Sequence, residues 1–148
     1  MSRMSSSVLC VMLLTCLSLS PTRAIPADEK QSTLDTKMEP FRGRWTASRE
    51  SKEREKIRRY QLVLEFKGAE LAFFTEEDGK KGNEFTLKVI AVEEGPKESH
   101  LVLGFGSSKY VVHYDFEGEK MILVGRLPNR PFEGFSLSGE YNRAQKPK

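Results

Sequence analysis

The chain has 148 residues, which is enough for one domain with its own hydrophobic core and too few for two. Hydrophobic residues make up 38% of it, as in globular proteins, whereas 30% charged residues argue against a protein embedded in a membrane. The formal net charge is +3, but leaving Arg3 and Arg23 out of the 24 basic residues gives 22 against 21 acidic ones. A chain so close to neutrality gives no support to a nucleic-acid partner.

Residues 1–24 have the pattern of an export signal. Arg3 provides the positive start, residues 8–19 are an apolar stretch, and Thr22 and Ala24 place small side chains before a cut after Ala24. A membrane-spanning helix needs about 20 apolar residues, so an uncleaved anchor is the weaker alternative. We therefore expect a secreted or periplasmic protein with no stable membrane span once the signal is removed.

Both cysteines, Cys10 and Cys16, lie within this signal. The mature chain would then have no disulfide, no thiolate nucleophile and no cysteine metal site, and its apolar core alone would stabilise it. A lipoprotein cut before Cys16 is a second alternative, although Thr15 stands where such a cut needs a residue like Gly, Ala or Ser.

The segment 25–39 is polar and has no hydrophobic period, which predicts a linker. Alternatively, Leu34 and Met38 form one face of a short helical turn that caps the end of a barrel. We place the folded domain at 40–143 and a basic tail at 144–148. Its first strand opens on Gly43 and Trp45, the only tryptophan, where glycine lets the backbone come close and the indole plugs a barrel end.

The run 46–59 is the most charged part of the chain. Its Glu50–Arg54 and Glu55–Arg59 spacings support a helix, and the run predicts a solvated loop or short helix that leads to the next strand. A basic docking surface is the less favoured interpretation, because acidic residues are interleaved throughout.

From Tyr60 onward, apolar residues alternate with polar ones, which is typical of β-strands. Glycine and proline separate the runs, Gly106-Ser107 predicts a tight hairpin, and 127–131 must be a loop. Short strands with such turns predict a sandwich or barrel, and an up-and-down antiparallel meander of about eight strands tends to close. The expected strands after the first are 60–66, 71–74, 85–91, 101–105, 110–116, 121–125 and 135–141.

Several motifs follow one another in a recognisable order. They are Gly43-Arg44-Trp45, LVLEFKG at 62–68, FTLKV at 85–89, YDFEGEKMILV at 114–124, Asn129-Arg130-Pro131 and Tyr141-Asn142-Arg143. Together they resemble the planctomycete-type family of small exported domains of uncharacterised function, which are similar to lipocalins in layout. The resemblance covers 39–143 and implies export and a small lipocalin-like barrel, with no activity. It also implies that Arg143, or alternatively Arg126, packs across Trp45.

No group of residues predicts catalysis. The serines lack a nucleophile-elbow context, no cofactor motif is present, and the most concentrated acids fall on polar strand positions and turns. Those acids are Glu65, Glu70, Glu76, Glu77 and Asp78. We therefore expect a protein that is not an enzyme and needs no cofactor.

The two histidines, His100 and His113, would lie side by side if the hairpin is centred on Gly106-Ser107. Such a pair could hold a metal ion with a carboxylate such as Asp115. Because His113 alternates with apolar residues, it is expected to face outward, and a solvated surface pair is the favoured interpretation. We assign no metal site on sequence alone.

Aromatic residues on nearly every expected strand either fill the barrel or line a pocket for one small apolar ligand. Filling is the favoured interpretation. The expected function is an exported binding or interaction module, with a carrier of a small apolar molecule as the alternative. Its partner would be a small apolar ligand or another exported protein, and the candidate ligand-binding residues are Tyr60, Phe73, Phe85, Tyr110, Tyr114 and Phe135.

Overall fold

The computed structural model describes residues 27–53, 56–128, 130–132 and 135–144. The expected export signal at 1–24 and the end of the basic tail at 145–148 lie outside these residues. Within them, no helix is long and apolar enough to cross a bilayer.

The segment expected as a linker is helical along most of its length. Helix α1 (Ala27–Met38) leads through the 3₁₀ turn η1 (Glu39–Phe41) into the first strand. Met38 is fully buried, Leu34 packs against the core, and the Lys37 Nζ donates a hydrogen bond of 3.1 Å to the Val92 carbonyl. The prediction of a linker was therefore wrong here, because Leu34 and Met38 share one helix face that the end of the barrel covers.

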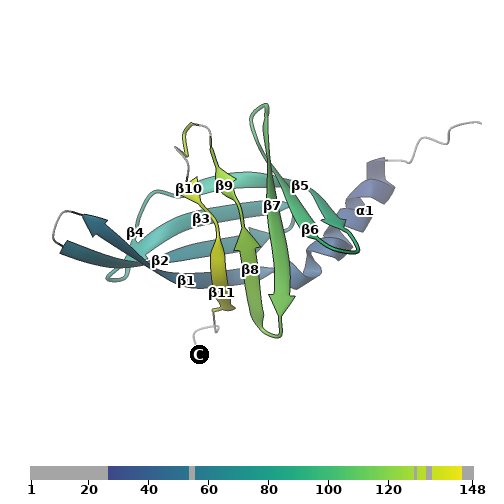
Figure 1. Cartoon of the computed structure of the whole chain (residues 1–148). Helices are drawn as coiled ribbons and strands as arrows, with labels where there is room; N and C mark the ends of the chain where they lie inside the picture. The colour runs from purple at the N-terminus through teal and green to yellow at the C-terminus, as the bar shows by residue number, and fades with distance from the viewer. Residues whose placement is uncertain (1–26, 54–55, 129, 133–134, 145–148) are drawn as a thin grey trace, which may run out of the picture.

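Eight strands form a closed antiparallel barrel, as the alternating pattern predicted (Figure 1). Neighbours in sequence pair with one another, and the β1–β11 and β2–β3 pairings complete the ring. The two-residue strand β4 extends the sheet beside β3, and β9 pairs with β10 in a separate ribbon. The strands are β1 (Gly43–Glu53), β2 (Lys56–Lys67), β3 (Glu70–Glu77), β4 (Lys80–Lys81), β5 (Phe85–Glu94), β6 (Ser99–Phe105), β7 (Ser108–Glu117), β8 (Lys120–Val124), β9 (Arg126–Leu127), β10 (Phe135–Ser136) and β11 (Gly139–Arg143).

Within the charged run 46–59, residues 46–53 lie on β1 and residues 56–59 on β2, in the outer half of the β1–β2 hairpin, so the prediction of a loop or helix was wrong for these residues. Figure 1 shows this hairpin projecting beyond the barrel. The β1–β2 ladder continues to Glu53 and Lys56, well past the last pairing of β1 with β11 at Thr46. Its charges pair across the two strands: Glu50 lies opposite Arg59, with 2.8 Å between Oε1 and Nε. Opposite charges can thus pair across two strands as well as along a helix, which is why the charge spacing alone did not identify the hairpin.

Two details of strand register differ from simple alternation. A bulge between Val89 and Ala91 shifts β5 by one residue, so that Val92 is buried where Ala91 was expected. The expected final strand 135–141 is divided into β10 and β11. Between these two strands, the Leu137 amide donates a hydrogen bond to the Gly125 carbonyl, and the chain then enters β11 in the barrel wall at Gly139. The 127–131 segment, expected as a loop, contributes Leu127 to β9.

Inward side chains from all sides meet in one continuous apolar core. Among the described residues, no polar or charged residue is fully buried. The aliphatic members of this core that are exposed by 1% or less include Leu62, Leu64, Leu71, Leu87, Val89, Leu101, Leu103, Val112, Met121, Leu123, Leu127 and Leu137.

Candidate functional site

The end of the barrel beside η1 is closed by Trp45. Gly43, which opens β1 with φ of 109°, brings the chain from η1 into the sheet. The Trp45 indole N–H donates a hydrogen bond of 2.6 Å to the Phe41 carbonyl, and the indole is 1% exposed. The Arg143 guanidinium carbon lies 4.7 Å from the centre of the indole ring, as the resemblance implied, and its Nη2 donates to the Pro40 carbonyl at 2.8 Å. Arg126, the alternative, is exposed on β9.

Further aromatic rings complete this closure. The Phe41 ring centre lies 5.5 Å from Phe66, 4.8 Å from Tyr114 and 5.0 Å from Phe116. Burial and the charge of Glu94 raise the pKa of Tyr114. The Phe41 carbonyl therefore accepts the indole N–H and the Arg143 guanidinium covers the indole face, while the rest of this end consists of aromatic rings in contact with one another.

Tyr141 and Arg49 bind the backbone of the segment that leads into β11. The Tyr141 hydroxyl donates a hydrogen bond of 2.7 Å to the Leu137 carbonyl, and Arg49 donates to the Ser138 carbonyl. Burial raises the pKa of Tyr141 to about 12, although the neighbouring Arg49 lowers it in part. Gly139 passes directly over Arg49: a Cβ at Gly139 would come within 2.5 Å of the guanidinium. These contacts are structural, because the hydroxyl is fully buried and already bonded.

The opposite end is closed by Phe132, which sequence reasoning missed. Its ring centre lies 5.7 Å from Phe73, 5.4 Å from Phe85, 5.1 Å from Phe105 and 5.9 Å from Tyr110. The Tyr110 hydroxyl is buried and has no hydrogen-bond partner among the described residues. Phe132 follows a proline in a segment without periodicity, so no sequence signal placed it inside.

The candidate ligand-binding residues therefore do not form one pocket. Phe73, Phe85, Tyr110 and Phe135 gather at the Phe132 end, where Phe135 lies 5.2 Å from Phe73. Tyr114 packs at the Trp45 end. Tyr60 belongs to neither group: it is half-buried on β2 and lines a surface hollow of about 320 Å³ beside the β1–β2 hairpin.

Three of the five acids that the sequence places on polar strand positions and turns, Glu65, Glu76 and Glu77, lie within ion-pair distance of basic side chains. Glu76 pairs with Arg44 at 2.6 Å, and Glu77 pairs with Arg58 at 2.5 Å. The hydrogen bond from Arg58 lowers the pKa of Glu77. Such ion pairs at the surface hold the β1–β2 hairpin against β3 and do not form a carboxylate pair of the kind that acid–base catalysis needs.

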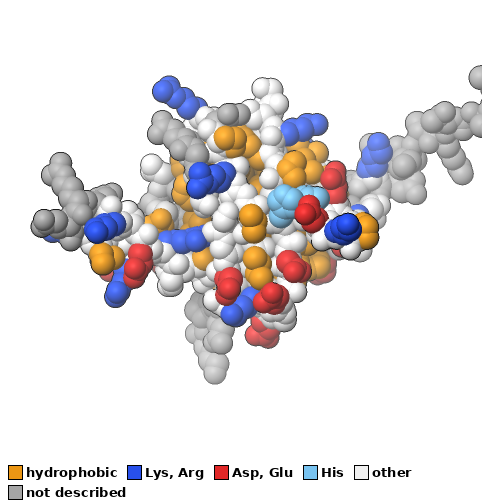
Figure 2. Space-filling view, in the orientation of Figure 1, with side chains coloured by type: hydrophobic (Ala, Val, Ile, Leu, Met, Phe, Trp, Pro, Cys, Tyr) orange, Lys and Arg blue, Asp and Glu red, His pale blue; other side chains and the backbone are white. Residues whose placement is uncertain are grey.

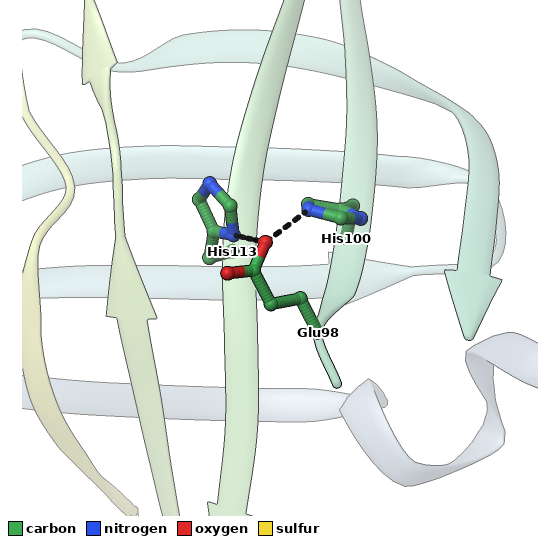
Figure 3. A group of neighbouring side chains, drawn as sticks. All are labelled: Glu98, His100 and His113. Atoms are coloured by element: carbon green, nitrogen blue, oxygen red, sulfur yellow. Dashed lines mark ion pairs between the residues drawn. The ribbon is translucent and has the colours of Figure 1, made fainter. Parts of the chain in front are cut away.

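On the outer face of the barrel, His100 and His113 lie directly opposite each other on β6 and β7, as the hairpin register predicted. Their ring centres are 4.4 Å apart, at an interplanar angle of 61°. The carboxylate between them comes from Glu98, not from Asp115 (Figure 3). Glu98 Oε2 lies 3.6 Å from His100 Nε2 and 3.6 Å from His113 Nδ1.

Glu98 and Asp115 differ in how the backbone places them. Glu98 ends the turn before β6, where Gly95 N donates a hydrogen bond of 3.0 Å to the Glu98 carbonyl. Asp115 turns toward its own strand, because its Oδ1 accepts a hydrogen bond of 2.8 Å from Phe116 N. The spacing Glu98-Ser99-His100 was the available signal, since residues two apart lie on one face of a strand.

A surface groove of about 500 Å³ borders this group. Its walls include Lys97, Glu98, His113, Tyr114, Ile122 and Val124. Figure 2 shows the imidazoles at the surface, with hydrophobic side chains above and to the left of them and acidic side chains on the right. On the same outer face, Val111, two residues before His113, is 55% exposed, and Val124, the β8 partner of His113, is 56% exposed. The outer face of β6, β7 and β8 therefore combines three potential ligating groups with an apolar border.

Comparison with models of known protein families, with curated proteins and with solved structures finds no match for this chain.

Proposed function

We propose that this β-barrel is a small exported binding module without catalytic activity, and that it binds through its outer surface. The observation that carries the proposal is the packing of the interior. Fully buried aliphatic side chains fill the middle of the barrel, and a cluster of aromatic rings closes each end.

Rings at these distances are in contact, and an apolar guest would have to displace them. Protein interiors pack as densely as organic crystals, so the loss of contacts with a displaced side chain must be offset by the guest. A guest inside would therefore compete with Phe132 at one end or with Trp45 at the other. The outer face of β6 to β8 requires no such displacement.

The exported location rests on the sequence. The apolar stretch 8–19 between Arg3 and Ala24 supports a cleaved signal, and the resemblance to small exported lipocalin-like domains points the same way. An exported domain that lacks cysteine in its mature part is stabilised by its core, and this agrees with an interior used for packing.

One observation favours the alternative of a carrier. The Tyr110 hydroxyl is buried without a partner in the described part of the chain, and buried polar groups of this kind are rare. A small apolar molecule with one polar atom, held at the Phe132 end, would satisfy it.

Mass spectrometry of the full-length chain, expressed and exported by a bacterial host, separates these functions. Denaturing conditions give the mass of the processed chain, and we expect a cut after Ala24. Under native conditions we expect no retained small molecule. An environment-sensitive apolar dye should remain dark with the wild-type protein and bind to Phe132→Ala, in which one end of the barrel is emptied.

Val111→Ala serves as the matched control, because it removes an exposed side chain from the outer face and should bind no dye. A small molecule retained by the wild type at one per chain, or stoichiometric dye binding that Phe132→Trp abolishes, would overturn the proposal in favour of the carrier. An uncut chain would overturn the export part alone.

A further inference from the structure

Three ligating groups converge on the outer face from two adjacent strands. His100 on β6 and His113 on β7 are cross-strand partners, and Glu98 lies two residues before His100. Because β6 and β7 are joined by the tight Gly106-Ser107 turn and β6 is paired with β7 over its whole length, the spacing of the imidazoles is fixed by the backbone. The ligating atoms of the three side chains all lie within 4.8 Å of one another.

We propose that Glu98, His100 and His113 bind a divalent transition-metal ion of the Zn²⁺ type. This inference rests on the proposed use of the outer surface and names a ligand for it. A tetrahedral ion at about 2.0–2.2 Å from each ligand places the ligands roughly 3.3–3.5 Å apart. The Glu98 carboxylate lies 3.6 Å from each imidazole, so the carboxylate is almost at this spacing before any ion is bound.

The types of ligand decide the class of metal. Two imidazoles and one carboxylate favour Zn²⁺, Cu²⁺ or Ni²⁺, whereas Ca²⁺ and Mg²⁺ prefer sites made of oxygen atoms. Asp115, the nearest acid on β7 in sequence, accepts a hydrogen bond from its own neighbour and is not one of the three. The group therefore differs from a simple cluster of surface acids.

The open side of the site indicates how the ion would be used. Three protein ligands leave a fourth position for water or for an atom of a bound molecule. A groove of about 500 Å³, which Glu98 and His113 line together with Ile122 and Val124, borders the three ligands. Lys97 adds a positive charge at the same groove. A ligand with a carboxylate or imidazole next to an apolar group fits this combination.

Gly95 positions the carboxylate. A Cβ at Gly95 would come within 2.7 Å of the Glu98 carbonyl oxygen, to which the Gly95 amide already donates a hydrogen bond. Any larger residue there would shift the Glu98 backbone and, with it, the carboxylate. Gly95 is thus a positioning residue for the site.

Calorimetric titration with Zn²⁺ alone tests the proposal, on exported protein purified without a polyhistidine tag and treated with a chelator. We expect one ion per chain. His100→Ala/His113→Ala should abolish binding. Glu98→Gln should weaken Zn²⁺ binding by more than about 100-fold. Loss of a residue that only hydrogen-bonds a metal ligand costs roughly 10- to 100-fold, and Glu98 is itself a ligand. Asp115→Asn is the matched control and should change the Kd by no more than about twofold, because a surface substitution away from the ligands has only a small energetic effect.

Thermal unfolding of each variant without metal shows whether it is folded, and these surface positions should tolerate the changes. Absence of saturable binding at one ion per chain would overturn the metal site, as would an unchanged Kd in the double histidine variant. Competition by equimolar Ca²⁺ would also contradict it. Failure here leaves the filled barrel intact, whereas a ligand retained in the interior would overturn the outer-surface module without affecting this titration.

Discussion

The two ends of the barrel are both closed by aromatic rings, yet they differ in how their polar atoms are satisfied. At the Trp45 end, the indole N–H has the Phe41 carbonyl as its acceptor, and Arg143 covers the ring while it bonds the Pro40 carbonyl. At the Phe132 end, four aromatic rings pack against Phe132, but the Tyr110 hydroxyl lacks a partner among the described residues.

This difference implies that the Trp45 end is held in one arrangement, whereas the side chains of the Phe132 end can rearrange more easily. Indole, carbonyl and guanidinium at the Trp45 end fix one arrangement, because moving any of them breaks a hydrogen bond, and the bond of the indole is buried. Ring packing at the Phe132 end is less directional, and a buried hydroxyl without a partner makes that arrangement costly to keep. If the barrel ever admits a guest, it should do so at the Phe132 end.

Alanine substitutions at the two ends should give the largest and most unequal losses of stability. Trp45→Ala removes a fully buried indole with its hydrogen bond and its cation–π contact, and should lower the free energy of unfolding by about 3–5 kcal/mol. Phe132→Ala leaves the strand ladders intact and should cost roughly half as much, because it removes ring contacts but no side-chain hydrogen bond and no cation–π contact. Urea unfolding of both variants measures this difference.

Arg143→Gln provides the control, since it keeps the indole and removes the cation. It should cost roughly 0.5–2 kcal/mol, the usual range of a cation–π contact. Equal losses for Trp45→Ala and Phe132→Ala would mean that the two ends are held equally firmly, and the distinction drawn from their polar atoms would fail.

The barrel was predictable because it depends on local pattern. Alternation from Tyr60 onward sets which face is inward, and the Gly106-Ser107 turn sets the register that places His100 opposite His113. The contact of Arg143 with Trp45 was reached through a resemblance, since no local pattern links residues at the two ends of the barrel sequence.

The errors arise where tertiary contacts decide. The run 46–59 is charged along both faces, so only its pairing with the opposite strand makes it a hairpin. Met38 ends a polar helix and is buried because the barrel end covers it. Phe132 lies in a bend without periodicity, and Glu98 lies in a turn, where only its two-residue spacing from His100 hinted at its place; the contacts of both follow from where the backbone brings them.

Tyr141 extends the comparison to alkaline pH, because its buried hydroxyl is bonded while that of Tyr110 is not. Burial raises the pKa of Tyr141 from 10 to about 12 in the folded protein. Above pH 10 the unfolded chain loses this proton while the folded chain keeps it, so stability falls as pH rises from 10 to about 12. The loss should reach about 2–3 kcal/mol from this group.

Denaturant unfolding of wild type and Tyr141→Phe across this pH range isolates the contribution. The variant should lose less stability than the wild type as pH rises, because phenylalanine has no proton to release. Tyr114, whose pKa is also raised but whose side chain is partly exposed, adds a smaller loss to both proteins. Parallel curves for the two proteins would show that the Tyr141 hydroxyl ionises alike in the folded and unfolded chains.

Tyr110→Phe should give the smallest effect and one of opposite sign. Removing a buried hydroxyl that lacks a partner relieves its desolvation cost, so the free energy of unfolding should rise by about 1 kcal/mol. Tyr141→Phe at neutral pH is the matched control, and the loss of its hydrogen bond to the Leu137 carbonyl should cost about 1 kcal/mol. A loss of stability in Tyr110→Phe would mean that solvent or a guest satisfies this hydroxyl. The Phe132 end would then be as well satisfied as the Trp45 end, and a water or ligand there would account for its rings being arranged around a polar atom.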